Sequence, residues 1–266
     1  MRRSKVTAAI IAKNEEKNIK GCIETVLGWA DEVVVVDGCS TDKTAPIARS
    51  LGARVIEHAW EGNFAKERNI ANENSRCDWV LHIDADDRVT DEFKKRVDEV
   101  LDSDKTVDVY KFKRKSFFLD HFMEYGGWYH YVPNLVRRGR VRFEGDLHER
   151  PSYSGKLGTI EADIEHYPFD SISQFIERHN RYSTIQAARI FKENGAFRMS
   201  EVKKNLLGKS FKTFWKIYVK KKGRREGIHG LIFAMLFAFM NFMVWAKYWE
   251  LCDKEKRGRE GGSIRE

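Results

Sequence analysis

Strand and helix patterns alternate along the first part of this chain. Four consecutive valines at positions 33–36 form an unbroken apolar run, which is typical of a strand buried on both faces of a sheet. Short runs rich in β-branched residues also occur at 6–12, 54–57 and 79–83, and stretches with helical spacing occupy 19–29, 41–51 and 64–74. Strands that alternate with helices over short connections predict an α/β fold with a mostly parallel sheet flanked by helices.

The pattern changes twice farther along the chain. Between 107 and 167, strand-like pieces at 109–112, 134–136, 141–143 and 160–164 alternate with glycine and aromatic clusters. From Ser171 onward the spacing is helical, beginning with a stretch at 174–192 that stops near Gly195. We therefore expect two parts, an α/β domain at 1–168 and a helical extension at 169–266.

Carboxylates follow the strand expected at 79–83. Asp84 and Asp86 are two residues apart, so on an extended backbone their side chains point the same way. Two like charges on one face repel each other unless a cation lies between them, and carboxylate oxygens suit Mg²⁺ or Mn²⁺. Because such an ion keeps coordination positions for phosphate oxygens, the sequence predicts a metal site that binds a diphosphate.

Polar residues also follow the two earlier strands. Asn14 and Glu15 come after the strand at 6–12, and Asp37 comes directly after the four valines. In open α/β sheets, ligands bind at the carboxyl ends of the strands. Since a buried acid is costly without a partner, we expect these side chains to face solvent or a ligand at that edge.

The C-terminal part contains an apolar stretch at 227–246 that has no Asp, Glu, Lys or Arg. About 20 apolar residues suffice to span a bilayer. Basic residues crowd the preceding segment and Lys247 follows the stretch, which favours a membrane-associated helix. A helix buried in a core or a dimer interface is the alternative, and His229 and Asn241 favour a helix lying in the membrane plane over a full span.

Charge and cysteine content limit the partners and the compartment. The formal net charge of +8 predicts a polyanionic partner, and we expect anionic lipid and a phosphorylated substrate rather than nucleic acid. The four cysteines lack CxxC spacing, which indicates a reducing compartment without a disulfide framework or a structural zinc site. No signal peptide is expected, because the first apolar run is short and is followed at once by charged residues.

Three motifs occur in order at the expected strand ends: IAKNEE at 11–16, VDGCSTD at 36–42 and DAD at 84–86. Together they resemble those of the inverting family 2 glycosyltransferases, which have the GT-A fold and carry a DXD motif. The match is good from position 6 to about 87 and looser beyond. Later features, including a His-Glu pair at 148–149 and the C-terminal apolar stretch, resemble bacterial lipopolysaccharide core glycosyltransferases.

The resemblance implies a role for each candidate residue. The nucleotide-binding candidates are Ala12, Asn14, Glu15, Asp37, Lys66, Arg68 and Asp84. The metal candidates are Asp84, Asp86 and His148, with Asp87 either beside the metal site or capping a helix. The base that deprotonates the acceptor is expected to be Glu149, with Asp146 as second choice.

The resemblance also implies the reaction and its place. A sugar nucleotide donates its sugar to an acceptor hydroxyl with inversion, and a divalent ion stabilises the leaving diphosphate. The acceptor is expected to be lipid-linked or lipopolysaccharide, at the cytoplasmic face of the inner membrane, with a hexose or heptose as the sugar.

Three other classes of protein fit the pattern less well. A nucleotidyltransferase that makes sugar nucleotides would share the metal acids, but it would have a glycine-rich loop where this chain has KNEE at 13–16. A dehydrogenase would show GxGxxG after the first strand, and none is present. A non-catalytic basic membrane adaptor would leave the acids at the strand ends without explanation.

Overall fold

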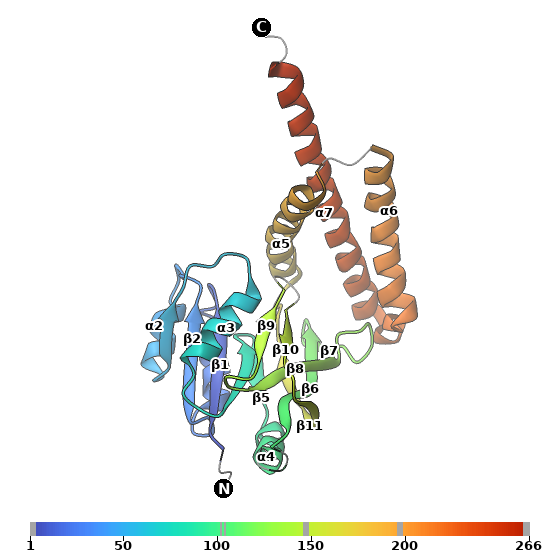
Figure 1. Cartoon of the computed structure of the whole chain (residues 1–266). Helices are drawn as coiled ribbons and strands as arrows, with labels where there is room; N and C mark the ends of the chain where they lie inside the picture. Colours follow the sequence, from blue (N-terminus) through green and yellow to red (C-terminus); the bar gives the residue numbers. More distant parts are fainter. Residues whose placement is uncertain (1–3, 102, 104, 146–148, 196–198, 263–266) are drawn as a thin grey trace. The chain divides into compact units, whose positions relative to one another are not determined.

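A mixed sheet organises the N-terminal part of the chain in the computed structural model, which describes residues 4–101, 103, 105–145, 149–195 and 199–262 (Figure 1). Within these residues nine strands belong to the sheet, in the order β3-β2-β1-β4-β8-β6-β11-β5, with β7 paired to β6. The first four strands along the chain are β1 (Val6–Ala12), β2 (Glu32–Asp37), β3 (Arg54–Glu57) and β4 (Trp79–Asp84). The others are β5 (Asp87–Val89), β6 (Val107–Phe118), β7 (His121–Phe122), β8 (His130–Arg137) and β11 (Lys156–His166).

Parallel pairing holds from β3 to β4, and the remainder of the sheet is mixed. β1 lies between β2 and β4 and is parallel to both. Beyond β4, β8 is antiparallel to β4 and β6, while β11 is parallel to β6 and antiparallel to β5. A separate hairpin pairs β9 (Arg142–Glu144) with β10 (Arg150–Ser152). The α/β fold class expected from the sequence is confirmed.

Both faces of the sheet are buried, as the four valines predict. Along β1, Ala8 and Ile10 contribute to one apolar cluster while Ala9 and Ile11 contribute to another. Residues of α1 (Ile19–Val26), α2 (Thr44–Ser50) and α4 (Asp91–Val100) join the first cluster, and residues of α3 (Phe64–Asn74) join the second. Helices therefore flank the sheet on its two faces (Figure 1).

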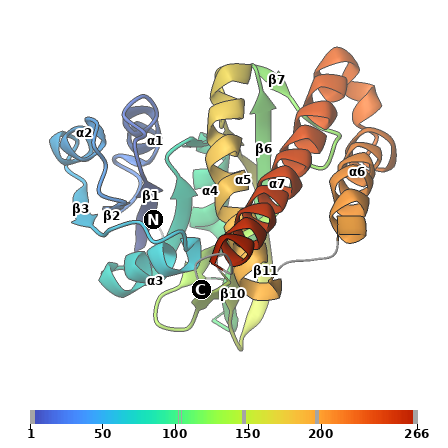
Figure 2. The same cartoon turned by 90° about the horizontal axis from the view of Figure 1, so that it is seen from above.

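The chain divides into two compact units, residues 1–116 with 130–168 and residues 117–129 with 169–266. The second unit contains α5 (Ile172–Asn194), α6 (Met199–Trp215) and α7 (Gly227–Gly262), with a π-helical turn at Lys216–Lys220 and a 3₁₀ turn at Gly223–Glu226. α7 lies between α5 and α6 (Figure 2). Two apolar clusters, one around Phe175 and Phe233 and one around Trp245 and Tyr248, hold these helices together.

One histidine in the sheet gives the fold a testable pH dependence. His82 on β4 is fully buried, and its Nε2 lies 2.8 Å from Oδ1 of Asn72 on α3. Burial, reinforced by the charge of Arg68, holds the pKa of His82 well below 6.5. Below pH 6.5 the unfolded chain therefore binds a proton that the folded protein does not, so stability falls as the pH falls.

We expect His82→Gln to remove this contribution, because the glutamine amide can still donate to Asn72. The free energy of unfolding of the parent should fall by about 1.4 kcal/mol more per pH unit than that of the variant below pH 6. Urea unfolding from pH 8 to pH 5 measures both slopes. Equal slopes would mean that His82 does not remain neutral in the folded protein.

Candidate active site

An acidic turn connects β4 to β5 at the carboxyl edge of the sheet. β4 ends at Asp84, Ala85 and Asp86 form the turn, and β5 begins at Asp87. The backbone N–H of Asp84 donates to Oδ2 of Asp87 over 2.8 Å, which closes the turn. The expectation that an extended backbone aligns Asp84 with Asp86 is therefore wrong, because the chain turns between them, although Arg114 approaches both carboxylates.

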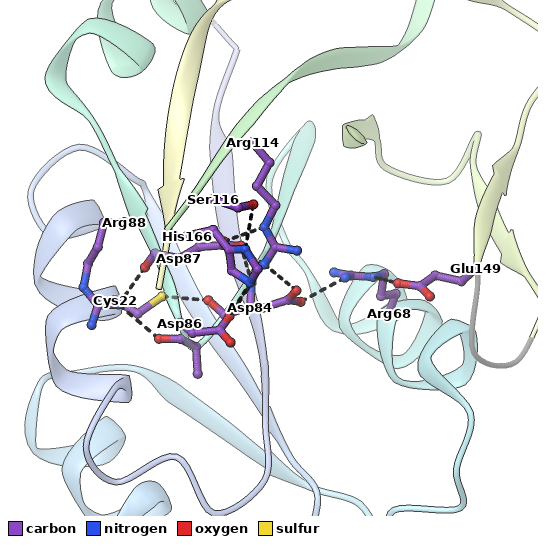
Figure 3. A network of polar contacts seen from close by, with 11 residues as sticks. Cys22, Arg68, Asp84, Asp86, Asp87, Arg88, Arg114, Ser116, Glu149 and His166 are labelled. Carbon is purple, nitrogen blue, oxygen red and sulfur yellow. Dashed lines mark hydrogen bonds and ion pairs between the residues drawn. The ribbon is translucent and has the colours of Figure 1, made fainter. Parts of the chain in front are cut away.

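Arg114 on β6 supplies the positive charge that this turn requires (Figure 3). Its Nη2 lies 2.7 Å from Oδ2 of Asp84, 2.7 Å from Oδ1 of Asp87 and 3.6 Å from Oδ1 of Asp86. Its Nε donates to Asp87 over 2.8 Å. One guanidinium therefore faces all three carboxylates, in a region where Asp86 and Asp87 are only 6% and 1% exposed.

The surroundings shift the pKa values of Asp84 and Asp87 in opposite directions. Burial alone would raise the pKa of Asp84, but the charges of Arg114 and Arg68 outweigh it and hold that pKa below the usual range. Burial raises the pKa of Asp87 to about 7 against the attraction of Arg114, and the charges of Asp84 and Asp86 act in the same direction as burial. Asp84 is therefore firmly ionised near neutral pH, whereas Asp87 is poised between its two forms.

Arg68 on α3 connects the acidic turn to the β9–β10 hairpin. Its Nη2 donates to Oδ1 of Asp84 over 2.9 Å and its Nε donates to Oε1 of Glu149 over 2.8 Å (Figure 3). Asn69, the next residue on α3, exchanges two hydrogen bonds with the backbone of Phe143 on β9. Glu149 and Asp84 thus meet the same guanidinium, and Nη1 of Arg68 is buried without a hydrogen bond to any described residue.

A metal-ligating group lies beside the arginine. Oxygens of Asp86 and Asp87 and a ring nitrogen of His166 lie within 4.8 Å of one another. Nε2 of His166 is 3.6 Å from Oδ1 of Asp86, and its Nδ1 is 3.0 Å from Oγ of Ser116. If Nδ1–H donates to Ser116, Nε2 presents a lone pair toward the acids. Two carboxylates and an imidazole are a donor set that fits Mn²⁺, and Mg²⁺ less closely.

This group differs from the metal residues expected from the sequence. Asp86 belongs to both sets, but the carboxylate of Asp84 is engaged by two arginines and lies outside the metal-ligating group. His148 and Asp146 lie outside the described residues. His166, at the end of β11, supplies the imidazole, and the sequence did not predict it.

The loops after β1 and β2 are joined by reciprocal hydrogen bonds. Asn14, at a positive φ of 55°, receives a hydrogen bond from Thr41 N–H on its Oδ1, and its own N–H donates to Oγ of Ser40. Glu15 N–H donates to Oγ1 of Thr44. Asn14 and Glu15 therefore fix the shape of this edge, whatever else they bind.

Asp37 lies at the centre of the same edge. It pairs in register with Ala12 across the β1–β2 ladder and is 2% exposed. Its Oδ2 accepts a hydrogen bond from Ser40 N–H over 2.8 Å, whereas its Oδ1 is buried without a partner among the described residues. Lys66, in contrast, is exposed and its Nζ binds Glu61, so the structure does not bring it to the acidic turn.

Sequence reasoning missed Arg114 as well as His166, although the strand pattern carries a signal for the arginine. Alternate residues of β6 point to opposite faces, and Phe112, Ser116 and Phe118 are buried. Arg114 shares their parity, whereas Lys113 and Lys115 have the other. A charged residue on a buried face requires buried partners of opposite charge, and the sequence offers three such partners in Asp84, Asp86 and Asp87.

The chain is similar to known glycosyltransferases over most of its length. The model of the family described as Glycosyl transferase family 2 matches residues 7–155. An uncharacterized glycosyltransferase of Rickettsia bellii is 28% identical over 274 residues, which cover 96% of this chain and 91% of that protein. The lipopolysaccharide core biosynthesis glycosyltransferase LpsC of Rhizobium meliloti is 26% identical over 92% of each chain.

Solved structures are only distantly similar. Glucosyl-3-phosphoglycerate synthase from Mycobacterium tuberculosis, in complex with Mn²⁺, UDP and glucosyl-3-phosphoglycerate, is 23% identical with a TM-score of 0.36. The match covers 43% of this chain and 44% of that one. A similarity of this size carries no inference about the site.

Proposed function

The chain belongs to glycosyl transferase family 2 and is a glycosyltransferase, and we propose that it transfers a sugar, with inversion, from a nucleotide-sugar donor to a hydroxyl of a membrane-associated acceptor. The observation that carries the proposal is the shared carboxyl edge of β1, β2 and β4. There, Ala12 pairs with Asp37 and Ile11 pairs with Asp84 in the parallel ladders, so Asp37 on β2 and the acidic turn after β4 lie on either side of β1. Strands are about 4.8 Å apart, so roughly 10 Å separates the two strand ends, a span that a sugar nucleotide can bridge.

Unsatisfied polar atoms support the donor site. The buried Oδ1 of Asp37 can accept a hydrogen bond from the base or the ribose, and the buried Nη1 of Arg68 can donate one to a phosphate oxygen. The loop residues Ala12, Asn14 and Glu15 would line the nucleoside. Lys66 stays a weaker candidate, because its ion pair with Glu61 must break before it reaches a ligand.

Asp86, Asp87 and His166 would hold the divalent ion, which we expect to be Mg²⁺ or Mn²⁺. When bound, the ion would offset the negative charge that builds on the departing diphosphate. Arg114 already offsets part of the negative charge of the acidic turn. It therefore holds the carboxylates of Asp86 and Asp87 in place before the ion and the donor bind. Asp84 would act chiefly by orienting Arg68 and Arg114.

The acceptor hydroxyl must lose a proton as it attacks the anomeric carbon. Glu149 is the proposed base, since it lies on the hairpin next to Arg68 and is 17% exposed in its side chain. In-line attack from the face opposite the diphosphate inverts the anomeric centre. Asp146 remains the second choice from the sequence.

The acceptor class rests on chain-wide similarity and on composition. LpsC, whose name assigns it to lipopolysaccharide core biosynthesis, matches nearly the whole chain. Within the described residues one helical segment, Gly223–Arg257, which includes most of α7, is long and apolar enough to cross a membrane. We propose a lipid-linked or lipopolysaccharide acceptor at the cytoplasmic face of the inner membrane, and a hexose or heptose as the transferred sugar.

Nucleotide-dependent thermal stabilisation tests the donor site. UDP with Mn²⁺ should raise the melting temperature by several degrees, because a ligand at 100 times its Kd stabilises by about 2.7 kcal/mol. Other nucleoside diphosphates serve as comparators, and release of diphosphate from a panel of sugar nucleotides then identifies the donor. A chain that responds to no nucleotide, with or without Mn²⁺, would contradict the proposal.

Asp86→Asn is expected to weaken Mn²⁺ binding by at least tenfold, because the variant loses a charged oxygen from the metal-ligating group. Calorimetric titration of the metal alone measures the change, and His166→Gln should produce a similar loss. Glu99→Gln is the matched control, since Glu99 is an exposed acid paired only to Arg96 among the contacts described. Unchanged Mn²⁺ affinity in both site variants would remove the group as the metal site.

A further inference from the structure

Large apolar side chains on α6 and α7 are exposed in two stripes. On α6 the stripe consists of Leu207, Phe211 and Trp215, which are 67%, 66% and 46% exposed. On α7 it consists of Ile228, Leu231, Met235, Phe239 and Phe242, the most exposed being Ile228 at 62%. The spacing of three or four residues places each stripe along one face of its helix. Contiguous exposed apolar surface of this kind marks an interaction site.

Both stripes lie on sides of the helix pair that α5 does not cover. Thr213 of α6 meets Asn241 of α7, and Lys209 meets Trp245, so the helices are antiparallel. With about 100° of rotation per residue, Phe211 lies about 200° from both Lys209 and Thr213, so the α6 stripe points away from α7. Met235 and Phe242 lie about 100–120° from Asn241, so the α7 stripe lies beside the contact with α6. α5 packs on the opposite side, where Phe175 contacts Phe237 and Lys247 reaches the backbone of Asn180. Figure 2 shows α7 between the other two helices.

The turn that joins the helices is strongly basic. It carries five exposed basic residues, which are Lys220, Lys221, Lys222, Arg224 and Arg225. The charge lies at one end of the apolar surface, and Trp215 and Tyr218 lie next to it. Basic residues with aromatic side chains beside an apolar face complement an anionic bilayer surface, which offers phosphate headgroups above acyl chains.

Polar contacts hold α7 to the rest of its unit along its length. Just before α7 begins, Glu226 of the 3₁₀ turn binds His121 and the backbone N–H of Tyr125. In its middle, Asn241 donates to Thr213, and farther on Nζ of Lys247 makes hydrogen bonds to α5 at Asn180, Ser183 and Thr184. A spanning α7 would carry α5 into the hydrocarbon, and α5 has charged residues such as Arg181 and Arg189 on exposed positions.

We infer that α6 and α7 form one membrane-binding surface that lies in the plane of an anionic leaflet, with only its apolar stripes inserted and its basic turn on the headgroups. α6, whose lysines suggest a solvated helix, contributes Leu207, Phe211 and Trp215 to this surface. The inference deepens the proposed membrane-associated function and rests on it for the location of the acceptor. The binding itself requires neither donor nor acceptor, so it can be tested separately.

The test is sedimentation of the full chain with preformed vesicles of phosphatidylglycerol and phosphatidylcholine. The parent should bind reversibly, bind less at high salt, and lose affinity as phosphatidylglycerol is removed. Leu207→Glu with Phe211→Glu on α6 should weaken binding at least tenfold, and so should Met235→Glu with Phe239→Glu on α7. Ile185→Glu, which changes an exposed apolar residue of α5 on the other side, is the matched control and should bind like the parent.

Three results would overturn the inference. Binding that resists salt and dilution and yields only to detergent would indicate a spanning helix. Full binding by the α6 variant would exclude α6 from the surface. If the parent chain forms a dimer and does not bind vesicles, and the glutamate variants are monomers, then the stripes are the interface with a second copy of the chain. Stabilisation by UDP and Mn²⁺, measured on the same variants, should be unchanged, which separates failure of this surface from failure of the proposed donor site.

Discussion

Arg114→Met should destabilise the protein by about 3–5 kcal/mol, the range expected when a buried ion pair loses one partner. Arg114 is the only described cation that faces all three acids of the turn, and its side chain is 15% exposed. Methionine fills a similar volume but leaves Asp84 with Arg68 alone and Asp87 with the backbone N–H of Asp84. Urea unfolding at pH 7.5 measures the loss.

The same substitution on the same strand provides the control. Lys115→Met also removes one positive charge from β6, but Lys115 is a half-exposed residue in a 4.0 Å ion pair, so its loss should cost less than about 1 kcal/mol. The Arg114→Met defect should shrink when the pH is lowered, since protonation relieves the unpaired carboxylates. Adding Asp87→Asn to Arg114→Met should restore part of the lost stability, because it removes one of the unpaired carboxylates. An Arg114→Met protein as stable as Lys115→Met would show that the acids do not depend on the arginine.

Local patterns carried enough information for the parallel half of the fold. The valines of β2 occupy both faces of the sheet, and the helical spacing at 64–74 coincides with α3. The sequence predicts less where an element is short or where its pairing partner lies far away along the chain. β5 has three residues, and α4 was not singled out although Thr90 caps it through the backbone N–H of Phe93. Neither the antiparallel strands beyond β4 nor their register follows from local periodicity.

The candidate site shows the same limit. The strand ends predicted that Asp37 and Asp84 emerge at one edge, because parallel strands in register determine that by themselves. What surrounds Asp84 depends on β6, thirty residues later in the chain, and on α3. From the motif alone, Asp84 is therefore predicted to bind the metal. In the structure its carboxylate binds the guanidinium groups of Arg68 and Arg114, and His166 joins Asp86 and Asp87 in the metal-ligating group. The assignment of each residue to a catalytic role stays a prediction.

Glu149→Gln is expected to lower kcat by 10²–10⁴, the usual contribution of a general base, while the donor KM changes little. Oε1 of glutamine can still accept the hydrogen bond that Arg68 Nε makes to Glu149 over 2.8 Å, so the link from the hairpin to Asp84 should persist. The amide cannot take the proton from the acceptor hydroxyl. Steady-state kinetics of sugar transfer, with the donor identified from the panel of sugar nucleotides, measure kcat and KM.

Glu144→Gln is the matched control, since Glu144 is exposed on β9 and pairs in register with Arg150 on the same hairpin. It should keep the kcat of the parent. Donor binding, followed by thermal stabilisation with UDP and Mn²⁺, should be equal in both variants, so that a fall in kcat reports on proton removal rather than on folding. Turnover near the parent rate in Glu149→Gln would exclude Glu149 as the base. A loss of donor binding would instead mean that the carboxylate matters by holding Arg68 in place.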